Sequence, residues 1–320
     1  MGSFAFNNAS RAAGRLLASG VLLWGFAEPA LPQTQDDLSE IVVQAPEPRF
    51  VAPTRRDQIG RIWAPVWINS KGPFRLVLDT GANRSGVTTQ VAELLGIALD
   101  ESPPVLLRGV NGIVTVPTIR VDSLTVGDLT LSPAILPVMA DALGGAQGVL
   151  ATDEFTDQRI SIDFKHDRID IRHSRNERAR WDFVTIPLER SETGLLVFHA
   201  LVGNVRTQAI IDTGGQRTIG NLAMRDALVR SHEPGYTVQI FDVTAEAQSA
   251  ESYPSPPIML DSIKILNPRI TYGDMHIFGH WHLTNKPALL IGMDVLGLLD
   301  TFIIDYRRHE LQLRMRTDQK

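Results

Sequence analysis

The sequence contains one short pattern twice. Residues 76–84 read LVLDTGANR and residues 209–217 read AIIDTGGQR, so three apolar residues precede Asp-Thr-Gly in both places. The two copies lie 133 residues apart, and a candidate short helix follows each of them, at residues 89–95 and 221–229. Such self-similarity at a fixed distance indicates that the chain is duplicated and folds as two similar halves.

Two further stretches repeat in the same order later in each half. They are residues 149–153 with 290–294, and residues 160–164 with 302–306. We therefore expect two lobes related by an approximate twofold axis, an N-terminal lobe at 56–178 and a C-terminal lobe at 179–320.

Between the repeats, the chain consists of short apolar runs that Gly, Pro, Asn and Asp interrupt. The runs at 113–116, 121–126 and 160–162 alternate or cluster in the way that is typical of β-strands. Convincing helical stretches are few. The sequence therefore predicts an all-β fold.

The N-terminus has the features of an export signal. Arg11 and Arg15 precede the apolar stretch 16–27, which ends in Gly-Phe-Ala with small residues at both recognition positions. We expect a signal peptide at 1–27, cleaved after Ala27, and a periplasmic or secreted protein. The alternative is a disordered or amphipathic arm.

The apolar stretch of about 12 residues is shorter than the ~20 that cross a bilayer, so we expect no stable membrane span. Residues 28–55 are rich in Pro, Gln, Asp and Glu. They are expected to form a linker or a prosegment-like arm, with a short strand at 41–43.

Composition argues against several classes of function. The 31 basic and 36 acidic residues give a formal charge of −5 without a long basic run, so we expect no nucleic-acid partner. The chain has no cysteine, which excludes disulfides and thiol nucleophiles. His276, His280 and His282 lack an evident acidic partner or fourth ligand, so we expect no metal site and no cofactor.

The Asp-Thr-Gly pattern is suited to acid–base chemistry. Each apolar strand would end in a carboxylate, Asp79 or Asp212, and Gly81 and Gly214 permit the tight turn that leaves it accessible. Two copies related by a twofold axis can bring the carboxylates together, where they share one proton because like charges that close cannot both ionise. One can then act as general base on a water while the other polarises a carbonyl group.

In these residues the chain resembles the retropepsin-like aspartic proteases of bacteria, in a single-chain, pepsin-like arrangement. The resemblance covers roughly residues 60–314. It implies two β-barrel-like lobes, catalytic roles for Asp79 and Asp212, and interlocking of Thr80 and Thr213 beneath them. It also implies an endopeptidase that acts on proteins or peptides, and we expect a monomer.

The same family has an apolar-apolar-Gly turn under each active-site loop. Residues 290–292 (LIG) fit this pattern, whereas residues 149–151 (VLA) carry Ala151 in place of Gly. We therefore expect a slightly displaced loop in the first lobe.

A flap, a hairpin that closes over the substrate, is expected at residues 106–114. Asn111-Gly112 between apolar runs is a strong hairpin signal, and the turn also contains Gly109 and Val110. An ordinary surface hairpin is the alternative. The corresponding segment of the second lobe, 239–247, lacks Gly, so the sequence does not favour a second flap.

The residues after the two glycines, Ala82 and Gly215, lack the hydroxyl group that pepsin-like enzymes usually have there. Without that hydrogen bond the lower pKa of the pair should rise, which predicts activity at mildly acidic to near-neutral pH. Two rival hypotheses remain. The chain could be a non-catalytic peptide-binding module, or one half alone could form a site between two chains.

Overall fold

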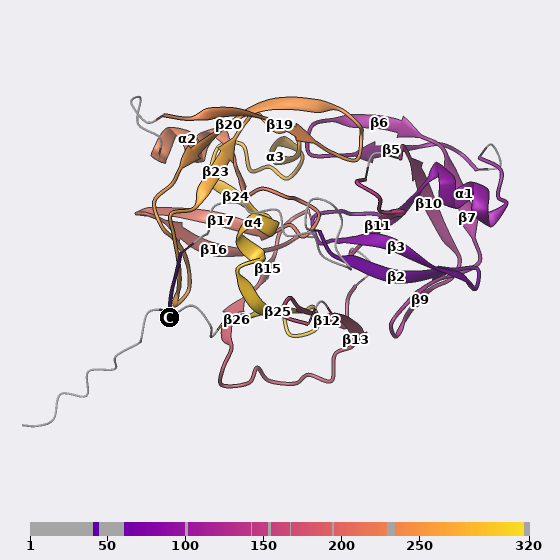
Figure 1. Cartoon of the computed structure of the whole chain (residues 1–320), viewed down its shortest axis with the longest axis horizontal. Helices are drawn as coiled ribbons and strands as arrows, with labels where there is room; N and C mark the ends of the chain where they lie inside the picture. The colour runs from indigo at the N-terminus through magenta and orange to yellow at the C-terminus, as the bar shows by residue number, and fades with distance from the viewer. Residues whose placement is uncertain are drawn as a thin grey trace, which may run out of the picture. The chain divides into compact units, whose positions relative to one another are not determined.

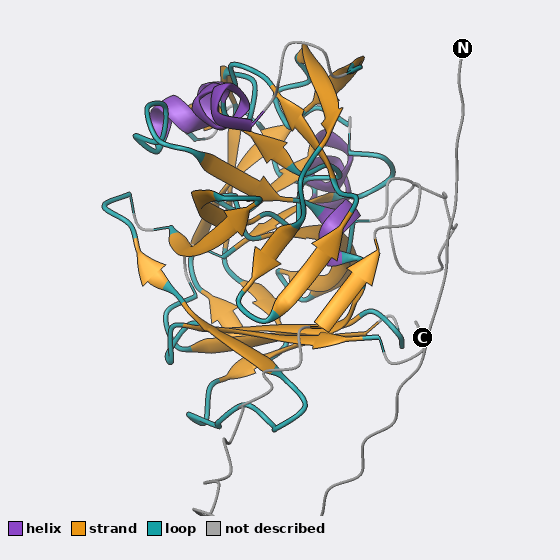
Figure 2. Ribbon diagram, turned by 90° about the vertical axis from the view of Figure 1, so that its left-hand side faces the viewer, coloured by secondary structure: helices purple, strands orange, loops and turns teal. Residues whose placement is uncertain are grey.

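The computed structural model describes residues 41–44, 61–99, 102–141, 143–152, 155–166, 168–193, 195–228 and 234–316. The predicted signal peptide and most of the predicted arm lie outside these residues. Strands dominate the described part and helices are short, as Figure 2 shows. The predicted all-β class is confirmed.

The first lobe, on the right of Figure 1, contains a sheet in which the strand that ends in Asp79 lies near the centre. Its strand order is β7 (Thr118–Val121), β10 (Ala134–Met139), β4 (Gly86–Thr88), β11 (Gly148–Ala151), β3 (Lys71–Asp79), β2 (Trp63–Ile68), β8 (Leu124–Val126) and β9 (Leu129–Leu131). A separate hairpin consists of β5 (Val105–Arg108) and β6 (Ile113–Val116).

The second lobe has a corresponding sheet with more strands. Its order is β1 (Ile41–Gln44), β22 (Ile263–Leu266), β21 (Ile258–Leu260), β16 (Leu196–Val202), β17 (Val205–Ile211), β24 (Ala288–Ile291), β18 (Ile219–Gly220), β23 (Arg269–Tyr272), β20 (Ala247–Pro254) and β19 (Tyr236–Phe241), and β15 (Glu189–Arg190) pairs with β16. The predicted strand at 41–43 is β1, which pairs in parallel with β22.

The strand pairings repeat in the two lobes. In the first, β3 pairs in parallel with β11, and β11 pairs antiparallel with β4. In the second, β17, β24 and β18 make the same two pairings. The two predicted helices are α1 (Thr89–Leu95) and α2 (Leu222–Leu228), and each follows an Asp-Thr-Gly loop.

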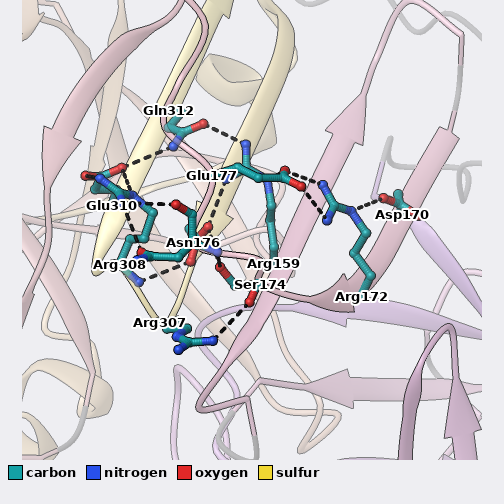
Figure 3. Close-up of polar contacts among 11 residues, drawn as sticks. Arg159, Asp170, Arg172, Ser174, Asn176, Glu177, Arg307, Arg308, Glu310 and Gln312 are labelled. Carbon is teal, nitrogen blue, oxygen red and sulfur yellow. Dashed lines mark hydrogen bonds and ion pairs between the residues drawn. The ribbon is translucent and has the colours of Figure 1, made fainter.

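A third sheet joins the lobes. Its order is β13 (Arg168–His173), β12 (Gln158–Asp163), β25 (Leu299–Asp305), β26 (Glu310–Met315) and β14 (Val184–Pro187). Strand β12 belongs to the first repeat and β25 to the second, and they pair antiparallel with Arg159 opposite Asp305. Figure 3 shows the polar side chains around this junction.

Two more short helices lie in the second half, α3 (His276–His280) and α4 (Met293–Leu296). Among the described residues, none of the helices is long and apolar enough to cross a membrane. The main core runs through both lobes and includes Leu76, Leu78, Ala209 and Phe302, each fully buried.

Candidate active site

Each Asp-Thr-Gly loop begins where a buried strand ends. Leu76, Val77 and Leu78 are fully buried in β3, and Asp79 is the last residue of that strand. In the second lobe, Asp212 directly follows β17. Because a buried strand fixes its own direction and register, each carboxylate emerges at a defined position.

Each loop folds around its own carboxylate. The backbone N–H groups of Gly81 and Ala82 donate to Oδ1 of Asp79 at 2.9 and 3.0 Å. The N–H groups of Gly214 and Gly215 donate to Oδ1 of Asp212 at 3.0 and 2.9 Å. These contacts fix both side chains and leave the second oxygen of each for other partners.

The two loops interlock through their threonines. The hydroxyl of Thr80 donates to the carbonyl of Ile211, and the hydroxyl of Thr213 donates to the carbonyl of Leu78, both at 2.6 Å. Each hydroxyl also accepts a bond from the backbone N–H of the other threonine, at 3.1 and 3.3 Å. The structure therefore holds the two loops against each other within one chain.

The two carboxylates are close neighbours. A Cβ atom placed on Gly81 would lie 3.4 Å from Oδ1 of Asp79 and 3.4 Å from Oδ1 of Asp212. These two oxygen atoms are therefore no further apart than twice that distance, which is close enough for their charges to interact.

Burial and this proximity set the protonation of the pair. Asp212 is 7% exposed, and burial together with the negative charge of Asp79 raises its pKa to about 7. Burial also raises the pKa of Asp79, while the N–H groups of Gly81 and Ala82 lower it. The pair therefore retains a proton at mildly acidic pH, because two neighbouring carboxylates titrate as one unit.

Arg61 is a residue of this site that the sequence analysis did not single out. Its side chain is 8% exposed, and Nη2 donates to the carbonyl of Leu143 at 2.8 Å. While burial raises the pKa of both carboxyls, the positive charge of Arg61 acts in the opposite direction on each. An arginine just before strand β2 gives no sequence signal, since only the folded chain brings it near the pair.

The predicted hairpin at 106–114 forms from β5 and β6, with Gly109 donating to the carbonyl of Gly112 across the turn. Its tip contacts the second lobe. The backbone N–H of Asn111 donates to Oδ2 of Asp242 at 2.7 Å. The side-chain amide of Asn111 donates to the carbonyls of Ile240 and Glu246, at 2.8 and 3.0 Å.

The second lobe has a hairpin at the corresponding place, which the sequence analysis did not favour. Strands β19 and β20 pair from Tyr236 to Phe241, and the turn needs no glycine. Oδ1 of Asp242 accepts a bond from the N–H of Thr244 at 2.9 Å, and Ala245 takes the left-handed conformation with φ of 62°. The turn is therefore closed by an aspartate that accepts a hydrogen bond from the backbone two residues later, and not by a glycine.

Each hairpin tip packs an apolar side chain against the opposite lobe. Val110 packs against an apolar cluster of the second lobe that includes Ile240, Ile277 and Phe278. Val243 lies 133 residues later in the sequence and packs against a cluster of the first lobe that includes Leu107. Together with the bonds of Asn111, this packing ties the hairpins to each other (Figure 1).

The turn beneath each active-site loop is built alike in both lobes. The N–H of Ala151 donates to the hydroxyl of Ser85 at 3.0 Å, and that of Gly292 to the hydroxyl of Thr218 at 3.2 Å. A Cβ on Gly292 would come within 2.5 Å of the backbone of Arg217. Ala151 already carries this Cβ, and the slight displacement expected for the loop of the first lobe stays a prediction.

The histidines set aside in the sequence lie on and after α3. Among the described residues, there is no group of three or more His, Cys, Asp or Glu side chains that could hold a metal ion. The helix instead supports the first hairpin, since the N–H of Ile277 donates to the carbonyl of Val110 at 3.2 Å.

Comparison with known proteins agrees with this geometry. Residues 64–153, which include Asp79 and the first hairpin, match the family model described as aspartyl protease. Among curated proteins, none matches the sequence. The first lobe is thus similar to the aspartyl protease family over these residues.

Proposed function

We propose that the protein is an aspartic endopeptidase with Asp79 and Asp212 as its catalytic residues. The observation that supports this most directly is the pair of carboxylates on interlocked loops from two lobes, with the pKa of Asp212 raised to about 7. Binding a peptide does not require two buried neighbouring carboxylates, which are costly to maintain.

In the proposed reaction, the pair carries one proton and binds one water. The ionised carboxylate takes a proton from the water as its oxygen attacks the peptide carbonyl carbon, and the protonated carboxyl donates to the carbonyl oxygen. The C–O bond forms and gives a tetrahedral intermediate. The pair then passes its proton to the amide nitrogen, the C–N bond breaks, and a hydroxyl proton of the intermediate returns to the pair, which again holds one proton.

The two hairpins give the proposed site a cover on both sides. Their tips, near Val110 and Val243, must part to admit an extended peptide and can then close over it. Because both carboxylates come from one chain, the proposed site needs no second copy, and we propose that the enzyme acts as a monomer on protein or peptide substrates.

Hydrolysis of a denatured protein tests the proposal. Asp79→Asn and Asp212→Asn should each lower the rate by about 10²–10⁴-fold, since each removes one member of the acid–base pair. Asp261→Asn is the matched control, because Asp261 is exposed in the turn between β21 and β22. Equal cleavage by the wild type and Asp79→Asn would contradict the proposal.

The same variants separate the rival hypotheses. A peptide-binding module would bind the denatured protein without cutting it. A site formed by one half in two chains would be lost in only one of the two variants. Loss of activity in both supports a single-chain site.

We also propose that the protein is exported after cleavage behind Ala27. N-terminal sequencing of the mature protein from the periplasm or the medium should then begin at Glu28. A mature chain that retains Arg11 and Arg15 would contradict it.

A further inference from the structure

Arginines line the pockets beside the first active-site loop. A pocket of about 340 Å³ lies between this loop and strand β5, lined by Asn83 and Arg84, by residues 105–108 and by Pro137. Among the described residues that line it, the charged ones are Arg84 and Arg108. Asn83 also lines a neighbouring pocket of about 200 Å³, in which the charged lining residue is Arg190.

The guanidinium groups of Arg84 and Arg108 are not neutralised by the described part of the chain. None of its carboxylates lies within 4.0 Å of either group. Asp242, at the hairpin tips, directs Oδ2 to the N–H of Asn111 and Oδ1 to the N–H of Thr244. Two positive charges therefore line a pocket in which the described residues offer no acidic partner.

The second lobe has a counterpart of Arg84. Arg217, 133 residues after Arg84, lies beside the phenol of Tyr236. The residue that corresponds to Tyr236 in the first lobe is Pro103, which has no polar side-chain group. The repeat therefore gives an arginine to both loops, but a nearby phenol only to the second.

We propose that Arg84 and Arg108 form a subsite for an acidic side chain, so that the substrates are peptides with Asp or Glu at one defined position. This inference rests on the proposed function, because it assigns a specificity to the same cleft. A guanidinium group binds a carboxylate through two parallel hydrogen bonds, and two arginines on adjacent walls can hold both carboxylate oxygens. A Gln or Asn side chain has the same shape but no charge, so its hydrogen bonds to the arginines would be weaker.

A paired-peptide assay tests the subsite. Cleavage profiling of a peptide library identifies the preferred position, and two peptides are then made that differ only in Glu or Gln there. The wild type should cut the Glu peptide about three- to tenfold more efficiently, as expected for one charged contact at a partly exposed site. Arg84→Gln and Arg108→Gln should each reduce this preference, mainly by slowing cleavage of the Glu peptide.

Two further variants sharpen the result. Arg84→Glu should shift the preference toward Lys or Arg at the same position, because the sign of the charge is reversed. Arg120→Gln is the control, since Arg120 is exposed on β7, away from the pocket lining. Cleavage of the library without acidic preference, or an acidic preference that persists in Arg84→Gln and Arg108→Gln, would overturn the subsite while the protease proposal stands.

Binding separates this inference from the proposed function. Fluorescence anisotropy compares the Glu and Gln peptides on the Asp212→Asn variant, which should not cut either of them. If the wild type cuts nothing, the peptide pair is taken from library members that the Asp212→Asn variant binds. Tighter binding of the Glu peptide that Arg84→Gln abolishes supports the subsite in either case. Equal binding of the two peptides contradicts it.

Discussion

The glycines of the two Asp-Thr-Gly loops leave different amounts of room beside the carboxylates. A Cβ on Gly214 would lie 2.3 Å from Cγ of Asp79, closer than real Cβ contacts, whereas one on Gly81 would lie 3.4 Å from both carboxylates. Gly214→Ala should therefore displace Asp79 and lower kcat by about 10²-fold, the effect of misplacing a catalytic group by about 1 Å. Gly81→Ala is the matched control and should lose much less. Equal kcat values for the two variants would contradict this asymmetry.

The titration of the pair predicts the pH dependence of the proposed activity. Burial and the charge of Asp79 raise the pKa of Asp212 to about 7, and burial also raises the pKa of Asp79. The rate should fall as pH rises through about 7, because the shared proton is lost. The rate should also fall as the pH drops, because the second carboxylate becomes protonated. Since burial raises the pKa of Asp79, this acid limb should lie above the usual carboxyl pKa of about 4. A profile of kcat/KM against pH with its maximum near pH 2–3 would be incompatible with this assignment.

Substitution of Arg61 provides a second test of this pH profile. The positive charge of Arg61 lowers the pKa of both carboxyls, so Arg61→Gln should move both limbs of the profile to higher pH, and Arg61→Lys should move them little.

The sequence identified Asp79 and Asp212 because their motif carries the chemistry locally. It could not identify Arg61, whose influence depends on tertiary packing beside Leu143.

The sequence predicted one of the two hairpins and missed the other, and their turns show why. Asn111-Gly112 is a local turn signal, and the hairpin formed where the sequence indicated it. The turn after Phe241 depends on the side chain of Asp242, which closes it by bonding Thr244. A search for glycine misses such a turn, although an Asp two residues before a Thr is a readable, weaker signal.

The contact between the hairpins predicts how the cover opens. Asn111→Ala removes the two amide bonds to the carbonyls of Ile240 and Glu246 but keeps the backbone bond to Asp242. Hydrogen exchange of residues 105–116 should become several-fold faster, since about 1 kcal/mol is lost per bond and part of it is recovered from water. Asn69→Ala removes bonds to the N–H groups of Asp122 and Ser123, and it serves as a control in another turn. Unchanged exchange at 105–116 would show that the backbone bond to Asp242 and the packing of Val110 and Val243 suffice to hold the tips together.

At the scale of the whole molecule, duplication predicted two similar lobes but not the sheet that joins them. Asp163 and Asp305 occupy equivalent places in the repeat. Asp163 lies at the surface and pairs with His166, whereas Asp305 is fully buried and pairs with Arg159. The sequence pattern of each strand is compatible with either environment, because only the pairing of β12 with β25 decides which face is covered.

The buried pair in this sheet predicts how firmly the lobes are held. Nη1 of Arg159 lies 2.9 Å from Oδ2 of Asp305, and Nη2 donates to the side chain of Gln312 at 2.8 Å, within the network of Figure 3. Arg159→Met leaves Asp305 buried without its counter-charge, although the hydroxyl of Ser174 still donates to it. We expect the free energy of unfolding in urea to fall by about 3–5 kcal/mol.

A double variant separates the charge from the packing. Arg159→Met combined with Asp305→Leu removes both buried charges and should recover much of the loss, since apolar residues of similar volume replace buried ion pairs at little cost. Arg120→Met, at an exposed position on β7, should change the unfolding free energy by less than about 0.5 kcal/mol. Because Asp79 and Asp212 come from different lobes, Arg159→Met should also lose its proposed activity at a lower temperature than the wild type. If Arg159→Met unfolds at the same urea concentration as the wild type, the lobes are held by the apolar core and the active-site loops rather than by this pair.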